Sequence, residues 1–251
     1  MESSRRTFLA SAGLLAGHPL AARYAVARSL RDKPLRVGQI GTKHAHASGK
    51  MATFRKFPEV FEVVGVVEPD DAQWGRVSSQ SAYKGLKRIS EDQLLGHDGL
   101  QAVAVETEIE QLLDTAERCI SSGVHIHLDK PAGTSLAQFQ RICAAADQKG
   151  LTIQLGYMFR SNPAFRFLFK AVRDGWLGDV FQVHCEMSKK VGDSTRAALA
   201  KYPGGAMFEL GCHLIDAVVT VLGRPQAVRP FLRNSRPDFD QLNDNCLAVF
   251  E

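Results

Sequence analysis

The strongest constraint on the fold is an alternation of short β-rich runs with amphipathic stretches that begins at Leu35. The β-rich runs are LRVGQI, FEVVGVV, LQAVAV, VHIHL and LTIQLGY, and the helical patterns between them include HASGKMATFRKF, EIEQLLDTAERCISS and SLAQFQRICAAADQKG. Strands that alternate with helices of 10–15 residues are typical of βαβ units and a parallel sheet. The sequence therefore predicts a doubly wound α/β domain over residues 34–155.

The pattern changes after Gly156, where a second α/β domain is predicted over residues 156–251. The segment NPAFRFLFKAVRDG predicts a helix with Asn162 as its N-cap and Pro163 in its first turn. GDVFQVHCEM and CLAVFE are both predicted to be strands, and an apolar helix lies between them. Because the chain stops at Glu251 within an apparent strand, which leaves a sheet edge open, we expect the sequence to be a fragment.

Residues 1–27 predict an export signal. Paired arginines at positions 5 and 6 precede an apolar run, and AVA at positions 25–27 offers an A-x-A cleavage site. The run is shorter than the ~20 apolar residues of a membrane span and contains His18 and Pro19. We expect a twin-arginine signal, a periplasmic or exported protein, and no membrane association after cleavage. A frayed N-terminal helix is the alternative.

Charge and cysteine content exclude several classes of partner. Removal of residues 1–27 takes away three arginines and one glutamate, which lowers the formal net charge from +4 to +2. No basic stripe remains, so nucleic acid is not expected as a partner. The five cysteines are scattered and form neither a disulfide framework nor a zinc spacing. That usage fits folding in a reducing cytosol before export.

A candidate phosphate-binding loop, VGQIGTKHAHASGK, lies where the first predicted strand meets a helix. In the fingerprint G-x-G-x-x-G, Gly41 fills the first place, whereas Lys43 and His46 occupy the second and third. A loop of Gly41, Thr42 and Lys43 can still bind phosphate through the helix N-terminus, with Lys43 adding charge. An ordinary strand–helix turn is the alternative.

An acidic residue, Glu68, follows the second predicted strand in VVEPD. A carboxylate there can accept hydrogen bonds from the adenosine ribose and would repel a 2′-phosphate. We therefore expect NAD rather than NADP. A solvated loop carboxylate is the alternative.

The segment VHIHLDKPAG places Lys130 just after the strand at residues 124–128, which we count as the fifth. Ligands of doubly wound sheets lie beyond the carboxyl ends of the strands, so Lys130 is expected to face the cofactor crevice. His125 and His127 come before the strand's end, and we interpret them as packing or hydrogen-bonding residues.

The apolar helix within PGGAMFELGCHLIDAVVTVLGRP carries three ionisable residues, Glu209, His213 and Asp216. Spacings of four and three place them on one face of an α-helix. Because unpaired charges in an apolar helix are costly, this face either lines a polar cavity or forms a structural ion network. The spacing is not a strong zinc signature, and no metal site is predicted.

Several segments together resemble the Gfo/Idh/MocA group of oxidoreductases, named after glucose–fructose oxidoreductase and inositol dehydrogenase. They are VGQIGT, VVEPD, SSGVHIHLDKPAG, GYMFRSNPAF, GWLGDV and GGAMFELGCHLIDAV, in the order of the family. The resemblance implies an NAD(P)-binding Rossmann domain followed by an α+β domain with an open, mostly antiparallel sheet. It also implies that the C-terminal part of that domain is missing here and that the full-length protein is a homo-oligomer.

The resemblance assigns roles to individual residues. Lys130 matches the lysine that contacts substrate and nicotinamide, and His213 matches the acid–base histidine. Glu209 stands where the family usually has aspartate. The other matches are Tyr157 and Arg160 near the substrate, Asp216 one turn after the histidine, and Thr107 at the end of the fourth strand, where the backbone passes the cofactor.

Two departures from the family pattern concern the cofactor. The Gly-rich loop lacks its second and third small residues, and TEIEQL replaces the usual T-P-N-x-x-H after Thr107.

The expected reaction is hydride transfer between a sugar or polyol carbinol and NAD. His213 would accept the hydroxyl proton, Lys130 would stabilise the alkoxide, and Glu209 would orient His213 or a neighbouring hydroxyl. One alternative is redox-assisted glycoside cleavage that regenerates NAD. The other is a non-catalytic sensor of sugars or nucleotides.

Overall fold

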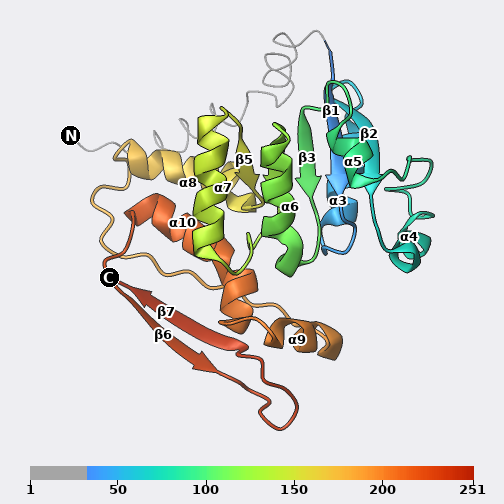
Figure 1. Cartoon of the computed structure of the whole chain (residues 1–251). Helices are drawn as coiled ribbons and strands as arrows, with labels where there is room; N and C mark the ends of the chain where they lie inside the picture. Colours follow the sequence, from blue (N-terminus) through green and yellow to red (C-terminus); the bar gives the residue numbers. More distant parts are fainter. Residues whose placement is uncertain (1–32) are drawn as a thin grey trace. The chain divides into compact units, whose positions relative to one another are not determined.

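The structure is a computed structural model that describes residues 33–251 (Figure 1). The predicted export signal at residues 1–27 lies outside the described residues. A five-stranded sheet has the strand order β2-β1-β3-β4-β5, and a two-stranded sheet pairs β6 with β7. The strands are β1 (Leu35–Ile40), β2 (Phe61–Val67), β3 (Ala102–Val105), β4 (His125–Leu128), β5 (Ile153–Leu155), β6 (Val228–Arg233) and β7 (Asn245–Phe250). This confirms the predicted α/β fold class.

The chain divides into two compact units between Ala104 and Val105, within β3. In the first unit, β1 and β2 are parallel and α3 (Ala47–Lys56) connects them. Two short helices, α4 (Asp71–Val77) and α5 (Glu91–Leu95), then lead to β3 on the other side of β1. The strand order therefore reverses between β1 and β3, which is the kind of position where doubly wound sheets bind ligands.

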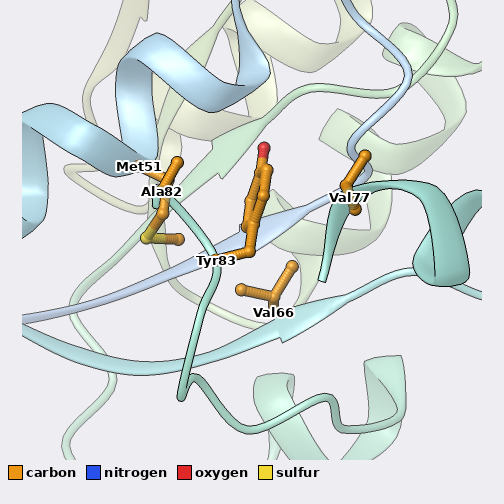
Figure 2. Packing of buried hydrophobic residues seen from close by; sticks show 5 residues of the cluster. All are labelled: Met51, Val66, Val77, Ala82 and Tyr83. Atoms are coloured by element: carbon orange, nitrogen blue, oxygen red, sulfur yellow. The ribbon is translucent and has the colours of Figure 1, made fainter. Parts of the chain in front are cut away.

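The core of the first unit packs α3 against β2 and the segment that follows α4. Figure 2 shows this cluster, which consists of Met51, Val66, Val77, Ala82 and Tyr83, all at most 6% exposed. The Tyr83 hydroxyl accepts a hydrogen bond of 3.0 Å from the buried Gln39 side chain. The ring can therefore be buried while its hydroxyl keeps a hydrogen-bond partner.

In the second unit, α6 (Ile109–Ser121) and α7 (Leu136–Gln148) pack side by side next to the parallel pair β4–β5 (Figure 1). The buried face of α6 follows the helical repeat at Leu112, Leu113, Ala116, Cys119 and Ile120. Burial of each large apolar side chain of this kind contributes about 1.5–3 kcal/mol.

The rest of the second unit is made of short helices and a hairpin. They are η1 (Met158–Arg160), α8 (Pro163–Arg173), α9 (Asp193–Ala200), η2 (Met207–Gly211) and α10 (Cys212–Leu222), followed by the antiparallel pair β6–β7. The predicted cap of α8 is confirmed, because the Asn162 side chain accepts hydrogen bonds from the amides of Ala164 and Phe165. Pro163 occupies the first turn, as predicted.

The predicted strand GDVFQVHCEM is wrong, because residues 178–187 form neither strand nor helix. An alternating pattern becomes a strand only when a neighbour supplies ladder hydrogen bonds, and within residues 33–251 the two sheets leave this segment unpaired. Phe181 is accordingly 94% exposed.

The strand β6 was not predicted, because Pro230 and two arginines interrupt its apolar pattern. The strand count was also wrong, since Lys130 follows the fourth strand and Thr107 the third.

A buried ion network connects α9 to the segment between β6 and β7. The Arg196 guanidinium donates to Asp240 at 2.5 Å and to Asp244 at 2.6 Å, and both aspartates lie in that segment. These hydrogen bonds raise the pKa of Arg196 above its usual value. The network fixes the approach of the hairpin to the helix.

Two further features follow from the described residues. No helix within residues 33–251 is both long and apolar enough to span a bilayer. The five cysteines are all free thiols, as their scattered positions predicted.

Candidate active site

The loop after β1 makes the tight turn that a dinucleotide site needs. Gly41 has φ of 88°, a value that favours glycine, and its amide donates to the Val67 carbonyl at 2.8 Å. The first turn of α3, which follows the loop, contains no acidic side chain that would repel an anion. The turn and the helix start therefore fit a bound phosphate, although Lys43 and His46 replace the second and third glycines of the fingerprint.

The Glu68 carboxylate lies against this loop and is only 3% exposed. Its Oε2 accepts hydrogen bonds from the Thr42 amide at 3.0 Å and the Thr42 hydroxyl at 2.7 Å. Its Oε1 accepts from the Asp70 amide at 3.0 Å. Glu68 thus joins the ends of β1 and β2, and its negative charge lies directly beneath the loop.

Asp70, which the sequence analysis did not single out, stands closer to the surface of the same loop. Its side chain caps α4 by accepting from the Gln73 amide and forms an ion pair of 3.1 Å with Lys43. The hydrogen bond from the Gln73 backbone amide, together with the contact from Lys43, holds the pKa of Asp70 below its usual value. The helix-cap pattern D-x-x-Q in EPDDAQ was the available signal.

Thr107 lies between β3 and α6 in the second unit and is 8% exposed. Its hydroxyl donates to the Glu108 carbonyl at 3.2 Å. The helix α6 begins at Ile109 without a side-chain cap at Glu108, so the departure from the usual proline-containing segment does not prevent this helix from forming.

Lys130 follows β4 and is 2% exposed. Its Nζ donates to two oxygens of one residue, the Glu209 carbonyl at 2.9 Å and Glu209 Oε1 at 2.7 Å. Residues 79 positions apart in the sequence therefore meet within the second unit. The lysine and the ionisable helix, which the sequence assigned to one expected reaction, are therefore in direct contact through Glu209.

The helix that supplies Glu209 begins as a π-helical turn. Residues Met207–Gly211 form η2, and α-helical geometry starts at Cys212. The predicted continuous α-helix from Glu209 to His213 is therefore wrong. Gly211 leaves room for the Met207 side chain, because a Cβ at position 211 would lie 2.3 Å from the sulfur of Met207. π-Helical turns are frequent at functional sites.

His213, from the first turn of α10, is 6% exposed and lies among aromatic side chains. Its ring centroid is 6.3 Å from that of Tyr157 in an edge-to-face arrangement and 5.8 Å from that of Phe159. Burial, with the nearby Cys212 and Asp216, raises the pKa of Tyr157. Burial is also the main reason that the pKa of Cys212 rises to about 11.

Asp216 and Arg160 are brought together as an ion pair. The guanidinium contacts both carboxylate oxygens, with Nε at 3.0 and 2.9 Å and Nη2 at 2.5 Å. The hydrogen bond to Asp216 raises the pKa of Arg160. The Asp216 side chain is 7% exposed, whereas that of Arg160 is 61% exposed, so the arginine is the member of the pair that reaches solvent.

The two histidines of β4 hydrogen-bond to the neighbouring strand segment, which agrees with their interpretation from the sequence. His125 Nδ1 accepts from the Thr152 amide at 2.9 Å, and His127 Nδ1 lies 3.2 Å from Gln154 Oε1.

Family models identify both parts of the chain. Residues 35–157 match the oxidoreductase family model with an NAD-binding Rossmann fold, and residues 165–251 match the GFO/IDH/MocA C-terminal domain. The chain belongs to the Gfo/Idh/MocA family. The resemblance inferred from the sequence motifs is thereby confirmed, and NAD is the cofactor of the family's Rossmann domain.

Several curated oxidoreductases and dehydrogenases align with more than half of this chain. The uncharacterized oxidoreductase YhhX of Escherichia coli (strain K12) is 29% identical over 58% of this chain and 42% of its own length. Inositol 2-dehydrogenase 1 of Saccharopolyspora erythraea is 28% identical over 60% of this chain and 45% of its own length. The chain spans about half the length of the curated relatives it matches.

Solved structures share the fold of this chain at low sequence identity. The WlbA dehydrogenase from Bordetella pertussis, in complex with NADH and UDP-GlcNAcA, has a TM-score of 0.76 at 18% identity, covering 88% of this chain and 64% of WlbA. GenD2 from gentamicin A biosynthesis, in complex with NAD, has a TM-score of 0.71 at 21% identity, covering 87% of this chain and 62% of GenD2.

Proposed function

We propose that the protein is an NAD-dependent oxidoreductase that acts on a CH–OH group of a sugar or polyol. The observation that carries this proposal is the pairing of Lys130 with Glu209, four residues before His213, in a buried setting. A lysine after β4, a carboxylate in η2 and a histidine at the start of α10 are groups that a carbinol oxidation can use. A dehydrogenase and an inositol dehydrogenase among the proteins similar to this chain support that substrate class.

Lys130 would bind the substrate hydroxyl and stabilise the alkoxide. An ammonium has three N–H donors. Glu209 supplies both acceptors that the Lys130 ammonium has within residues 33–251, so one of its three N–H donors is left for a substrate oxygen. A positive charge that is 2% exposed acts in a low dielectric, where it stabilises negative charge more strongly than in water.

His213 would accept the proton of the substrate hydroxyl as a general base. Its buried position against Tyr157 and Phe159 fixes the ring plane, and an unperturbed imidazole titrates near neutral pH. Bound NAD would accept the hydride from the carbinol carbon. Proton and hydride then leave the same C–OH group, and the product is a carbonyl.

Tyr157 and Arg160 would contact the substrate, while Asp216 would hold the Arg160 side chain in place. In the first unit, Gly41, Thr42 and Lys43 would bind the cofactor phosphates. The buried Glu68 charge beneath Thr42 supports NAD over NADP, because a 2′-phosphate would meet a carboxylate. The backbone at Thr107 would lie alongside the cofactor.

The decisive experiment is a His213→Ala substitution in the full-length protein, assayed with NAD against a panel of sugars, polyols and glycosides. We expect turnover to fall at least 100-fold, within the range that general-base catalysis contributes, while NAD affinity stays within about twofold. His184→Ala, at an exposed position, is the matched control.

The products of the same panel separate the candidate activities. Accumulation of NADH with a carbonyl product supports the dehydrogenase. Sugar release without NADH would instead indicate redox-assisted glycoside cleavage. Unchanged turnover in the His213→Ala protein would contradict the catalytic assignment, and NAD binding with no turnover on any compound would favour a sensor.

A further inference from the structure

Two carboxylates after β2 lie against the loop that follows β1, and they differ in exposure. Glu68 is 3% exposed, and both of its oxygens already accept hydrogen bonds from Thr42 and Asp70. The Asp70 side chain is 37% exposed, so it can reach a bound ligand directly. In dinucleotide-binding folds, the acidic end of the second strand is where the adenosine ribose lies. Asp70 is therefore the carboxylate that can contact the cofactor at this end of the site.

Each oxygen of the Asp70 carboxylate has its own partner. Oδ1 accepts from the Gln73 amide at 3.0 Å and caps α4, whereas Oδ2 lies 3.1 Å from Lys43 Nζ. The Gln73 side chain also ties α4 to the loop, because its Nε2 donates to the carbonyl and the hydroxyl of Thr42, both at 3.1 Å. The Asp70 carboxylate and the Lys43 ammonium are thus held together on the ribose side of the loop.

The Lys43 ammonium is a cation that a phosphate on the cofactor can contact, since its side chain is 34% exposed. NADP differs from NAD by a phosphate on the adenosine 2′-oxygen, and a phosphate monoester carries about two negative charges at pH 7. The pKa of Asp70 is lowered, so its carboxylate is ionised at that pH and balances the ammonium. The buried Glu68 carboxylate then adds a negative charge beneath the pair.

We propose that Asp70 is a specificity-determining residue, which excludes NADP by neutralising Lys43. With the aspartate in place, a 2′-phosphate meets a neutral ion pair above the Glu68 carboxylate. Without that charge, the same lysine can donate a charge-assisted hydrogen bond to the phosphate. This inference rests on the proposed NAD site and concerns the cofactor alone, whichever carbinol the enzyme oxidises.

Cofactor titration of the full-length protein tests the proposal without any substrate. The Asp70→Asn variant loses the charge but keeps an oxygen that can cap α4, and asparagine is as good an N-cap as aspartate, so the fold should be retained. We expect the dissociation constant of NADPH to fall about tenfold or more, because a hydrogen bond between charged groups is gained. That of NADH should stay within about twofold. Fluorescence of the reduced nicotinamide measures both.

Two further variants separate the role of this ion pair from a general effect of charge. Asp71→Asn is the matched control, because it removes the same charge from the next residue, whose carboxylate pairs with Arg88 at 2.6 Å. It should leave the preference for NADH over NADPH within about twofold of wild type. Adding Lys43→Met to Asp70→Asn should abolish the gain in NADPH affinity.

The outcomes distinguish a failure of this inference from a failure of the proposed function. Unchanged selectivity in Asp70→Asn, or an equal gain in Asp71→Asn, would overturn the inference and leave NAD dependence intact. A wild-type protein that binds no NADH, or that prefers NADPH, would overturn the proposed cofactor and this inference together.

Discussion

At the scale of single residues, the site depends on how Glu209 binds Lys130. The sequence placed Glu209 near His213 and predicted that it would orient that ring or a neighbouring hydroxyl. In the structure its carboxylate instead lies 2.7 Å from the lysine ammonium. The negative charge compensates a cation that is almost fully buried and limits how far the ammonium can move.

The substitution Glu209→Gln tests the charge in this contact. The amide oxygen can still accept a hydrogen bond, but the ion pair is lost, and hydrogen bonds to charged groups contribute about 1.5–3 kcal/mol. We expect kcat/KM for the carbinol substrate to fall about 10- to 100-fold, with the NAD dissociation constant unchanged by fluorescence titration. Glu186→Gln, at an exposed position, is the control. A value of kcat/KM within twofold of wild type would show that the charge is not needed.

The places of Lys130 after a strand and of His213 on an apolar helix could be predicted from the sequence, because each is fixed relative to one element. The partner of Glu209 could not be predicted. Helical spacing indicates which residues share a face, but not which side chain from a distant segment will meet them.

At the scale of elements, the start of the site helix depends on two glycines with positive φ. Gly204 has φ of 82° and Gly205 has φ of 49°. A Cβ on Gly205 would lie 2.5 Å from the Asn243 carbonyl, whereas a Cβ on Gly204 would have no neighbour closer than 3.7 Å. The chain before η2 therefore approaches the segment before β7 at a distance that only glycine permits.

Alanine at these two positions should have unequal effects on stability. Gly204→Ala should cost about 1 to 2 kcal/mol, because only the left-handed backbone conformation is strained. Gly205→Ala adds a clash with main-chain atoms, which typically costs a further ~1–3 kcal/mol. Urea denaturation followed by circular dichroism measures both. Equal losses would mean that the close approach to Asn243 relaxes at no cost.

Whether a strand could be predicted depends on whether a neighbouring segment supplies its hydrogen bonds. The strands β1 to β5 alternate with helices and have strong apolar patterns, and all were predicted. Residues 178–187 have a comparable pattern but no ladder partner among the described residues, and β6 forms despite its proline because β7 pairs with it along its length. A strand is a property of two segments, so one segment's pattern can mislead in either direction.

At the scale of the whole molecule, the charges predict how stability depends on pH. Several carboxyl groups have pKa values below normal in the folded state: Asp70, Glu110, Asp174, Asp240 and Asp244. Burial alone would raise the pKa of Asp244, but hydrogen bonds from Ser235 and Arg196 lower it to about 2. A depressed folded-state pKa stabilises the protein above the unfolded value of about 3.9 and ceases to do so as the pH falls through the folded value.

The variant Asp244→Asn should therefore be less stable than wild type at pH 7, with a difference that narrows as the pH falls from about 4 towards 2. Thermal unfolding at pH 7, 5, 4 and 3 measures this difference. Asp238→Asn, at an exposed position in the same segment, should match wild type throughout. A gap that stays constant down to pH 3 would show that the Asp244 charge does not contribute to folding.

One of the two oxygens that hold Lys130 is a main-chain carbonyl. No amino-acid replacement at position 209 removes that oxygen, so this hydrogen bond to the Lys130 ammonium does not depend on the side chain at position 209. Evolution can then exchange the acid at this position while the ammonium keeps one fixed contact, provided that the wide helical turn is conserved. Selection on this contact acts on the path of the backbone as much as on the identity of the residue.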